Sequence, residues 1–243
     1  MKLFLSILLT AFSVLFLIFA PSFFMPELEK NIYSVREEQK ESNFEGFLTL
    51  WHVADYPNSG RAQLNACIKQ IEKKYLHVYI QAETLNGKTA RDRMRKGEFP
   101  DIISFSAGFF EDPSNLMRVM PQPAVLQKLA QTCLWKGEPY AFPFMLTAKF
   151  PGLEEELNDA SRVVIHVQYV GFAKTEDQKK YEMCMNLASL LLSESMQKNL
   201  VKLNCVPVVS TPGLFETEDD YTMVYSAISE SLYFPPAFPG PLV

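Results

Sequence analysis

Aromatic and polar side chains lie where two apolar, strand-like runs end. Trp51 and Asp55 are at the end of one run, and Ser106 and Phe109 are at the end of another. An aromatic ring offers a flat apolar face to a sugar ring, and a carboxylate can accept hydrogen bonds from two hydroxyl groups. Side chains of these types therefore indicate a binding site for a small polar solute.

Further candidates lie close to these positions or in a later run. Asn58 and Arg61 follow Asp55 in a turn-rich segment and add polar groups, whereas Tyr140 lies in a later apolar run and offers another ring. The ligand-binding residues that we predict are Trp51, Asp55, Arg61, Ser106, Phe109 and Tyr140.

Most of these candidates also have a purely structural interpretation. Large aromatic side chains are often buried, so Trp51 and Tyr140 could pack in the core and Phe109 could anchor its loop. Asp55 could bond backbone N–H groups of its own turn or cap a helix. Both interpretations stay open for these residues. Asp101, at a turn between a helix and a strand, is expected to bond backbone N–H groups and not a ligand.

The sequence lacks the residue patterns of common active sites. It has no G-x-S-x-G, P-loop, G-x-G-x-x-G or H-E-x-x-H motif. Its histidines, His52, His77 and His166, are far apart and lie in strand-like runs. We therefore predict a protein that is not an enzyme and that holds no metal or cofactor.

The cysteines do not form a metal-binding pattern. Cys67, Cys133, Cys184 and Cys205 include no C-x-x-C pair and have no histidine cluster beside them. In an exported chain they could form disulfides with three possible connectivities. Cys67 and Cys184 also fall on apolar helix faces, where a free thiol packs as a small hydrophobic group.

Hydrophobic periodicity predicts alternating strands and helices. In chain order they are a strand at 47–53, a helix at 64–75, a strand at 77–83, a helix at 89–96 and a strand at 100–105. This order is typical of parallel strands joined by crossover helices. Ligands of such sheets bind outside the carboxyl ends of the strands, which is where Asp55 and Ser106 are expected.

The second half of the chain predicts more of the same domain. Thr175 and Gln178 form a capping box, with Thr175 as the N-cap of a helix that Ser193 interrupts. The other expected segments are strands at 139–144 and 162–172, a helix at 194–203, an extended return at 206–209 and a last helix at 218–232. The proline-rich tail that follows can be neither a helix nor a central strand.

Residues 1–24 predict a membrane segment. Lys2 precedes an uncharged apolar run from Leu3 to Phe24, which is long enough to span a bilayer as a helix. A secretory signal peptide has the same pattern, but no A-x-A site follows, so we favour an uncleaved signal anchor. With one basic residue on the short flank, the N-terminus is expected in the cytoplasm and the remainder outside the cell membrane.

The remainder of the chain divides into two parts. Residues 25–45 are polar and charged, as in a linker, and residues 46–243 form the predicted α/β domain. The net charge of −5 argues against a nucleic-acid partner, because phosphate groups select basic surfaces.

Five segments in this order resemble the bacterial extracellular solute-binding proteins of the carbohydrate type. They are residues 48–55 (LTLWHVAD), 71–80 (IEKKYLHVYI), 97–103 (GEFPDII), 137–143 (GEPYAFP) and 190–207, which contains LLLSESMQ and NCVP. The resemblance implies one lobe of the type II periplasmic-binding-protein fold. It also implies a sugar or similar polar solute as ligand and an ABC-type permease as partner.

One departure from the family concerns its second lobe. In the family a domain-sized insertion follows the segment that 137–143 resembles, whereas here residues 144–162 leave room for a remnant at most. Two-lobed receptors trap a ligand by hinge closure, and a single lobe offers half of that cleft. The alternative function is therefore a single-lobe module that binds another protein and has lost transport.

Overall fold

A computed structural model describes residues 44–56, 59–122, 124–149, 164–203, 205–210, 225 and 234–240. Apart from 73–76, these residues belong to one compact unit. The predicted anchor, residues 25–43 of the linker, and residues 150–162 lie outside the described ranges, as does the predicted helix 218–232 except for residue 225. Within the described ranges, no helix has both the length and the apolar character needed to cross a bilayer.

Strands and helices alternate through the first half of the described chain. The elements are β1 (Gly46–Val53), α2 (Arg61–Lys74), β2 (Val78–Leu85), α3 (Gly87–Arg95), β3 (Ile102–Ser106), α4 (Gln127–Gln131), β4 (Leu134–Trp135), β5 (Glu138–Pro139), β6 (Phe142–Lys149), β7 (Val164–Phe172), α5 (Gln178–Leu191) and α6 (Glu194–Lys202).

The main sheet is mostly parallel, as the alternation of elements predicts. Its strand order is β2-β1-β3-β7-β6, and β1 pairs in parallel with both β2 and β3. The exception is β7, which is antiparallel to β3 and to β6. Hydrophobic periodicity carries no information on strand direction, so the sequence did not reveal this exception. Strands β4 and β5 form a separate hairpin.

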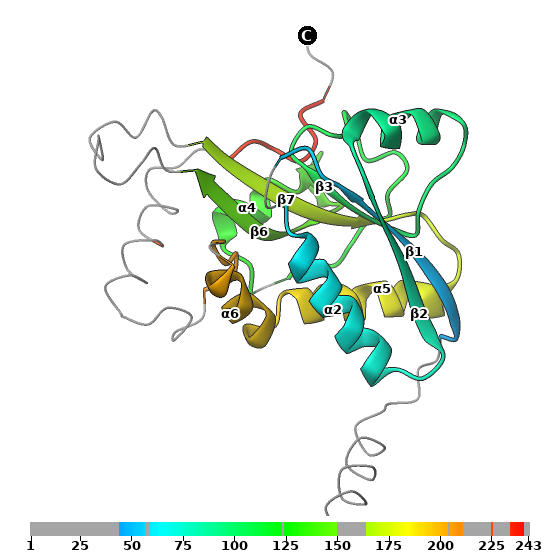
Figure 1. Ribbon diagram of the computed structural model, residues 1–243. Coiled ribbons are helices and arrows are strands. Elements are labelled where there is room, and N and C mark those ends of the chain that lie inside the picture. The colour runs from blue at the N-terminus through cyan, green and yellow to red at the C-terminus, as the bar shows by residue number, and fades with distance from the viewer. Residues whose placement is uncertain are drawn as a thin grey trace, which may run out of the picture. The chain divides into compact units, whose positions relative to one another are not determined.

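One face of the sheet is covered by three helices, α2, α5 and α6 (Figure 1). The Cys67 thiol of α2 lies 3.8 Å from the carbonyl oxygen of Leu187 in α5. The amide of Gln63 in α2 donates to the carbonyl oxygen of Met196 in α6 over 2.5 Å. Apolar positions that recur at helical spacing along α2 are buried by this packing.

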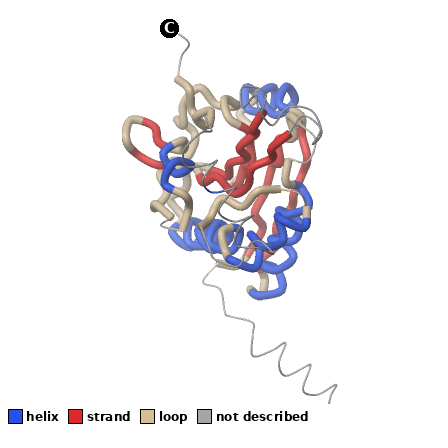
Figure 2. The backbone as a smooth tube through the Cα atoms, turned by 90° about the vertical axis from the view of Figure 1, so that its left-hand side faces the viewer, coloured by secondary structure: helices blue, strands red, loops and turns tan. Residues whose placement is uncertain are grey.

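Loops, α3, α4 and the C-terminal tail cover the other face, and Figure 2 shows the strands between them and the helices. Successive strand residues point to opposite faces, so Trp51 and Phe105 join this second core whereas His52 and Ser104 face the helices. The Tyr169 hydroxyl donates to the carbonyl oxygen of Pro235 over 2.9 Å, which holds the tail against the sheet.

The helix ends confirm most of the predicted boundaries. Asn86 caps α3 by accepting from the N–H of Thr89 at 2.8 Å, and Ser193 caps α6. The prediction of Thr175 as N-cap was wrong. Asp177 caps α5 instead, and the Thr175 hydroxyl oxygen accepts from the N–H of Asp177 at 3.1 Å. Both residue types favour this position, and only the backbone path selects between them.

Cys67, Cys133 and Cys184 are buried free thiols. Burial raises the pKa of Cys67 to about 12 and that of Cys184 to about 12, so neither forms a thiolate near neutral pH. These cysteines therefore pack as small hydrophobic groups, which was the simpler of the two interpretations.

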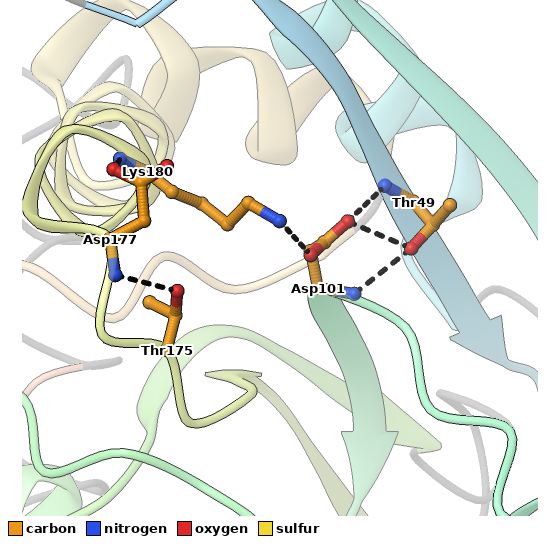
Figure 3. Close-up of polar contacts among 5 residues, drawn as sticks. All are labelled: Thr49, Asp101, Thr175, Asp177 and Lys180. Atoms are coloured by element: carbon orange, nitrogen blue, oxygen red, sulfur yellow. Dashed lines mark hydrogen bonds and ion pairs between the residues drawn. The ribbon is translucent and has the colours of Figure 1, made fainter.

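Asp101 ties three elements together at the amino-terminal end of β3 (Figure 3). One carboxylate oxygen accepts from the backbone N–H and the hydroxyl of Thr49 in β1, at 2.8 and 2.9 Å. The other accepts from the ammonium group of Lys180 in α5 at 2.8 Å. Burial alone would raise the pKa of Asp101, but the hydrogen bonds from Lys180 and Thr49 outweigh it and lower the pKa.

We expect the Asp101→Ala substitution to lower the unfolding free energy by about 1–2 kcal/mol, because it removes the acceptor of the partly buried Lys180 ammonium and of two exposed donors of Thr49. Asp92→Ala is the control, since Asp92 pairs with Arg95 in an exposed ion pair and its loss should cost at most about 0.5 kcal/mol. Urea unfolding followed by circular dichroism measures both. Equal losses in the two variants would contradict the role assigned to Asp101.

Candidate functional site

Asp55 and Ser106 meet at the carboxyl ends of β1 and β3. The Ser106 hydroxyl donates to one carboxylate oxygen of Asp55 at 3.1 Å. The other oxygen accepts from the backbone N–H of Gly87, the first residue of α3, at 3.0 Å. Asp55 is exposed and Ser106 is partly exposed, whereas Gly87 is buried beneath the carboxylate. We name these three residues the carboxyl-edge site.

The close approach of Asp55 explains why residue 87 is glycine. A Cβ atom added there would lie 2.6 Å from the Asp55 Oδ1 atom, well inside van der Waals contact. The carboxylate also lies at the N-terminus of α3, where the helix dipole favours negative charge. Asp55 thus accepts from the first N–H of α3, and it supplements the cap that Asn86 provides. It retains unused lone pairs, because a carboxylate can accept about four hydrogen bonds.

A buried chain of hydrogen bonds lies beneath the carboxyl-edge site. The two ring nitrogens of His52 lie 2.9 Å from the Ser59 hydroxyl and 3.2 Å from the Ser104 hydroxyl. The Gln168 amide of β7 donates to the Ser104 hydroxyl at 2.8 Å and accepts from the Tyr56 hydroxyl at 2.9 Å. His52, Ser104 and Gln168 are completely buried, so this chain of bonds provides the partners that buried polar groups require.

His52 stays neutral inside this network. Burial, and then the nearby Arg61 cation, lower the pKa of His52 from 6.5 to about 4. A neutral imidazole suits a position between two hydroxyl groups, because one ring nitrogen donates while the other accepts.

Arg61 begins α2 and is partly buried. Its Nη2 atom donates weakly to the carbonyl oxygen of Ala82 in β2 at 3.4 Å. Its Nη1 atom is buried and makes no hydrogen bond within the described ranges. Arg61 therefore places a positive charge beside β2, and its Nη1 atom is a donor that is buried from solvent.

Of the six predicted residues, Asp55 and Ser106 form the carboxyl-edge site, Arg61 bonds to β2 instead, and Trp51, Phe109 and Tyr140 lie elsewhere. Trp51 is 5% exposed and Phe109 is 6% exposed, and both belong to the second core. The Arg93 guanidinium lies 4.3 Å from the centre of the Trp51 ring, and Arg91 lies 4.8 Å from that of Phe109. Their ring faces are therefore already in contact with protein groups.

Tyr140 lines a separate groove of about 480 Å³. The groove is bordered by the loop after β3, the β4–β5 hairpin and the residue two positions after β7. Its lining residues are Asp112, Pro113, Ser114, Leu116, Met117, Arg118, Trp135, Lys136, Tyr140 and Lys174. We name it the hairpin groove.

Several residues in and around the two candidate sites were not predicted from the sequence. Gln168 lies in an apolar strand whose neighbour in the sheet could not be predicted, and Gly87 follows Asn86 in a pair that is typical of turns. Trp135 and Lys136 did carry a signal, since a tryptophan next to a Lys-Gly turn predicts an exposed hairpin tip. Among the described residues, no three His, Cys, Asp or Glu side chains are grouped as metal ligands.

The fold is similar to the folds of solved sugar receptors. An ABC substrate-binding protein from Listeria monocytogenes, in complex with cycloalternan, matches with a TM-score of 0.59 and 9% identity over 81% of this chain and 89% of that chain. The GacH receptor of Streptomyces glaucescens, solved unliganded and with acarbose, matches with a TM-score of 0.58 and 10% identity over 80% and 89%.

A third structure is the cyclic α-maltosyl-1,6-maltose binding protein from Arthrobacter globiformis. It matches with a TM-score of 0.59 and 9% identity, over 80% of this chain and 89% of that chain. At such identities the likeness establishes the fold alone. Neither a protein-family profile nor a curated protein sequence matches this chain.

We expect the Gly87→Ala substitution to destabilise the protein by about 1–2 kcal/mol, because the new methyl group displaces the Asp55 carboxylate. In an Asp55→Ala background the same substitution should be neutral or stabilising, since alanine is the better helix former and the clash is gone. Chemical unfolding of the two single variants and the double variant measures this reversal of sign. A loss of the same size in both backgrounds would show that Asp55 does not occupy this position.

The buried His52 predicts a pH dependence. Between about pH 6.5 and pH 4 the unfolded chain binds a proton at His52 and the folded chain does not, so the unfolding free energy falls as the pH falls, by at most about 1.4 kcal/mol per pH unit. His52→Gln should flatten this slope in urea unfolding between pH 7.5 and 4.5. His77→Asn, which changes an exposed histidine, is the control and should keep the wild-type slope.

Proposed function

We propose that this chain is a carbohydrate-binding protein of the extracytoplasmic solute-binding type and that it has no enzymatic activity. The observation that carries the proposal is the carboxyl-edge site, in which Asp55 and Ser106 stand together at the strand ends of a lobe with the fold of sugar receptors. Ligands of open α/β sheets bind at this edge. The similar structures were solved as binding proteins, and this supports a role in binding rather than catalysis.

The chemistry of the site suits hydroxyl groups of a sugar. Asp55 accepts hydrogen bonds, and the Ser106 hydroxyl oxygen retains acceptor capacity. Gly87 and Ser106 fix the carboxylate of Asp55 before a ligand arrives, so little side-chain entropy is lost on binding. Hydrogen bonds to a charged group also contribute more than those between neutral groups.

The proposal includes the place of the protein in the cell. The apolar run of residues 3–24 would anchor the domain on the outer side of the cell membrane, and an ABC-type permease would receive the solute. The support for this part is the sequence pattern of the N-terminus and the resemblance to receptors of import systems.

Isothermal titration calorimetry of the full chain in detergent, against a panel of neutral α- and β-linked oligosaccharides, tests the function. We expect saturable binding of at least one sugar, with a negative heat-capacity change. Asp55→Asn combined with Ser106→Ala should weaken that binding at least tenfold, about 1.4 kcal/mol. Asp92→Asn, on the exposed face of α3, is the matched control and should bind like the wild type.

The alternative, a module that binds another protein, has one observation in its favour. Phe47 and Tyr79 stack on the neighbouring strands β1 and β2 with ring centroids 5.2 Å apart, and they are 71% and 50% exposed. Exposed aromatic pairs of this kind are common at protein interfaces. No heat with any sugar of the panel, in a preparation that is folded by circular dichroism, would rule out the carbohydrate proposal and favour this alternative.

A further inference from the structure

The hairpin groove lies away from the carboxyl-edge site. One of its walls is Lys174, which follows the carboxyl end of β7. Because β7 is antiparallel to β3, Phe172 pairs with Ile102 at the amino-terminal end of β3, whereas Ser106 is at the other end of that strand. The groove is therefore a separate candidate site, and it does not depend on the function proposed for the carboxyl edge.

Backbone hydrogen bonds fix the walls of the groove. The N–H of Met117 donates to the carbonyl oxygen of Phe172 at 2.9 Å, and the N–H of Lys174 donates to that of Asn115 at 3.2 Å. The N–H of Val119 donates to the carbonyl oxygen of Pro139 at 3.0 Å, which joins the same segment to the hairpin. The groove is thus formed before a ligand binds, which lowers the entropic cost of binding.

The hairpin places Trp135 beside the tail. Lys136 and Gly137 have positive φ angles of 50° and 85°, as the tight turn between β4 and β5 requires. A Cβ atom added at Gly240 would lie 3.4 Å from the Trp135 ring, so the tail packs closely against the indole. Trp135 and Tyr140 thus line the groove as aromatic groups that are only partly buried.

The charged lining of the groove is mainly positive. Its charged residues are the cations Arg118, Lys136 and Lys174 and the acid Asp112. Arg118 is paired with Glu138 at 2.5 Å, whereas Lys136 and Lys174 form no ion pair within the described ranges. The Lys136 ammonium lies 5.9 Å from the centre of the Trp135 ring and acts electrostatically on Asp112, whereas Lys174 lines another wall. A negatively charged ligand would therefore meet Lys174 together with a Lys136 that already contacts the indole.

We propose that the hairpin groove binds an acidic saccharide, a sugar whose pyranose ring carries a carboxylate. The rings of Trp135 and Tyr140 offer apolar surface to the C–H face of the sugar. Lys136 and Lys174 attract the carboxylate, and Asp112 and the Arg118–Glu138 pair offer acceptors and donors to hydroxyl groups. A neutral sugar would offer these ammonium groups no negative charge. The carboxylate of the ligand therefore sets the preference for acidic over neutral saccharides.

Intrinsic fluorescence of the full chain in detergent can test the inference. The sequence has two tryptophans, and Trp51→Phe leaves Trp135 as the single reporter. We expect digalacturonic acid to change the Trp135 emission and to bind at least tenfold more tightly than galactobiose, its neutral counterpart. Binding should weaken as the salt concentration rises, because the ammonium groups lie near the surface.

Variants assign the effect to the groove. The double substitution Lys136→Met and Lys174→Met should abolish the preference for digalacturonic acid. The double substitution Lys136→Arg and Lys174→Arg keeps both positive charges and should keep the preference. Lys69→Met, on the exposed face of α2, is the control and should leave the preference unchanged. Asp55→Asn should leave the preference for digalacturonic acid unchanged. The proposal for the carboxyl-edge site and the proposal for the hairpin groove can therefore fail independently of each other. Equal affinity for the two disaccharides, or equally tight binding of inorganic phosphate, would overturn the inference.

Discussion

The parallel register between β1 and β3 is the constraint on which the candidate site depends. Asp101 fixes that register at the amino-terminal end, because its carboxylate accepts two hydrogen bonds from Thr49 of the neighbouring strand. Three residues further along each strand, His52 and Ser104 are directly paired in the sheet. A shift of β3 by one residue would turn Ser104 to the opposite core and away from His52, so the register has no neighbouring alternative. Only in this register do Asp55 and Ser106 leave the sheet side by side.

The second constraint is that buried polar groups need partners. His52, Ser104 and Gln168 lie in a layer that is otherwise apolar, and leaving any one unpaired would cost about 1–3 kcal/mol. Each is therefore held in one position by the others, and Gln168 extends the network to the antiparallel strand β7. The polar layer beneath the site thus helps to define where β7 lies relative to β3, which apolar packing alone would define less sharply.

The sequence predicts the part of this arrangement that follows from local pattern. The pattern of the run before Asp55 and of the run before Ser106 predicts parallel strands. Because parallel strands end at the same edge of a sheet, both side chains are expected at that edge. The direction of β7 and the contact between Asp55 and Gly87 could not be predicted, because each depends on how distant segments meet. Trp51 shows that residue type alone can also suggest a role that the structure does not support. Its type suits a sugar-stacking residue and a core residue equally, and only the register decides that it faces the second core.

The connection between β6 and β7 is short, and this limits what can cover the carboxyl-edge site. Residues 150–163 separate the two strands, too few for an inserted domain, so this connection cannot supply a second lobe that closes over the carboxyl edge. For the proposed function, affinity at this edge would then come mainly from groups that are in place before the ligand binds. Asp55 meets this requirement, because two hydrogen bonds hold its carboxylate in the absence of ligand. The bonds from Gly87 and Ser106 would therefore do for the proposed ligand part of what hinge closure does in a two-lobed receptor.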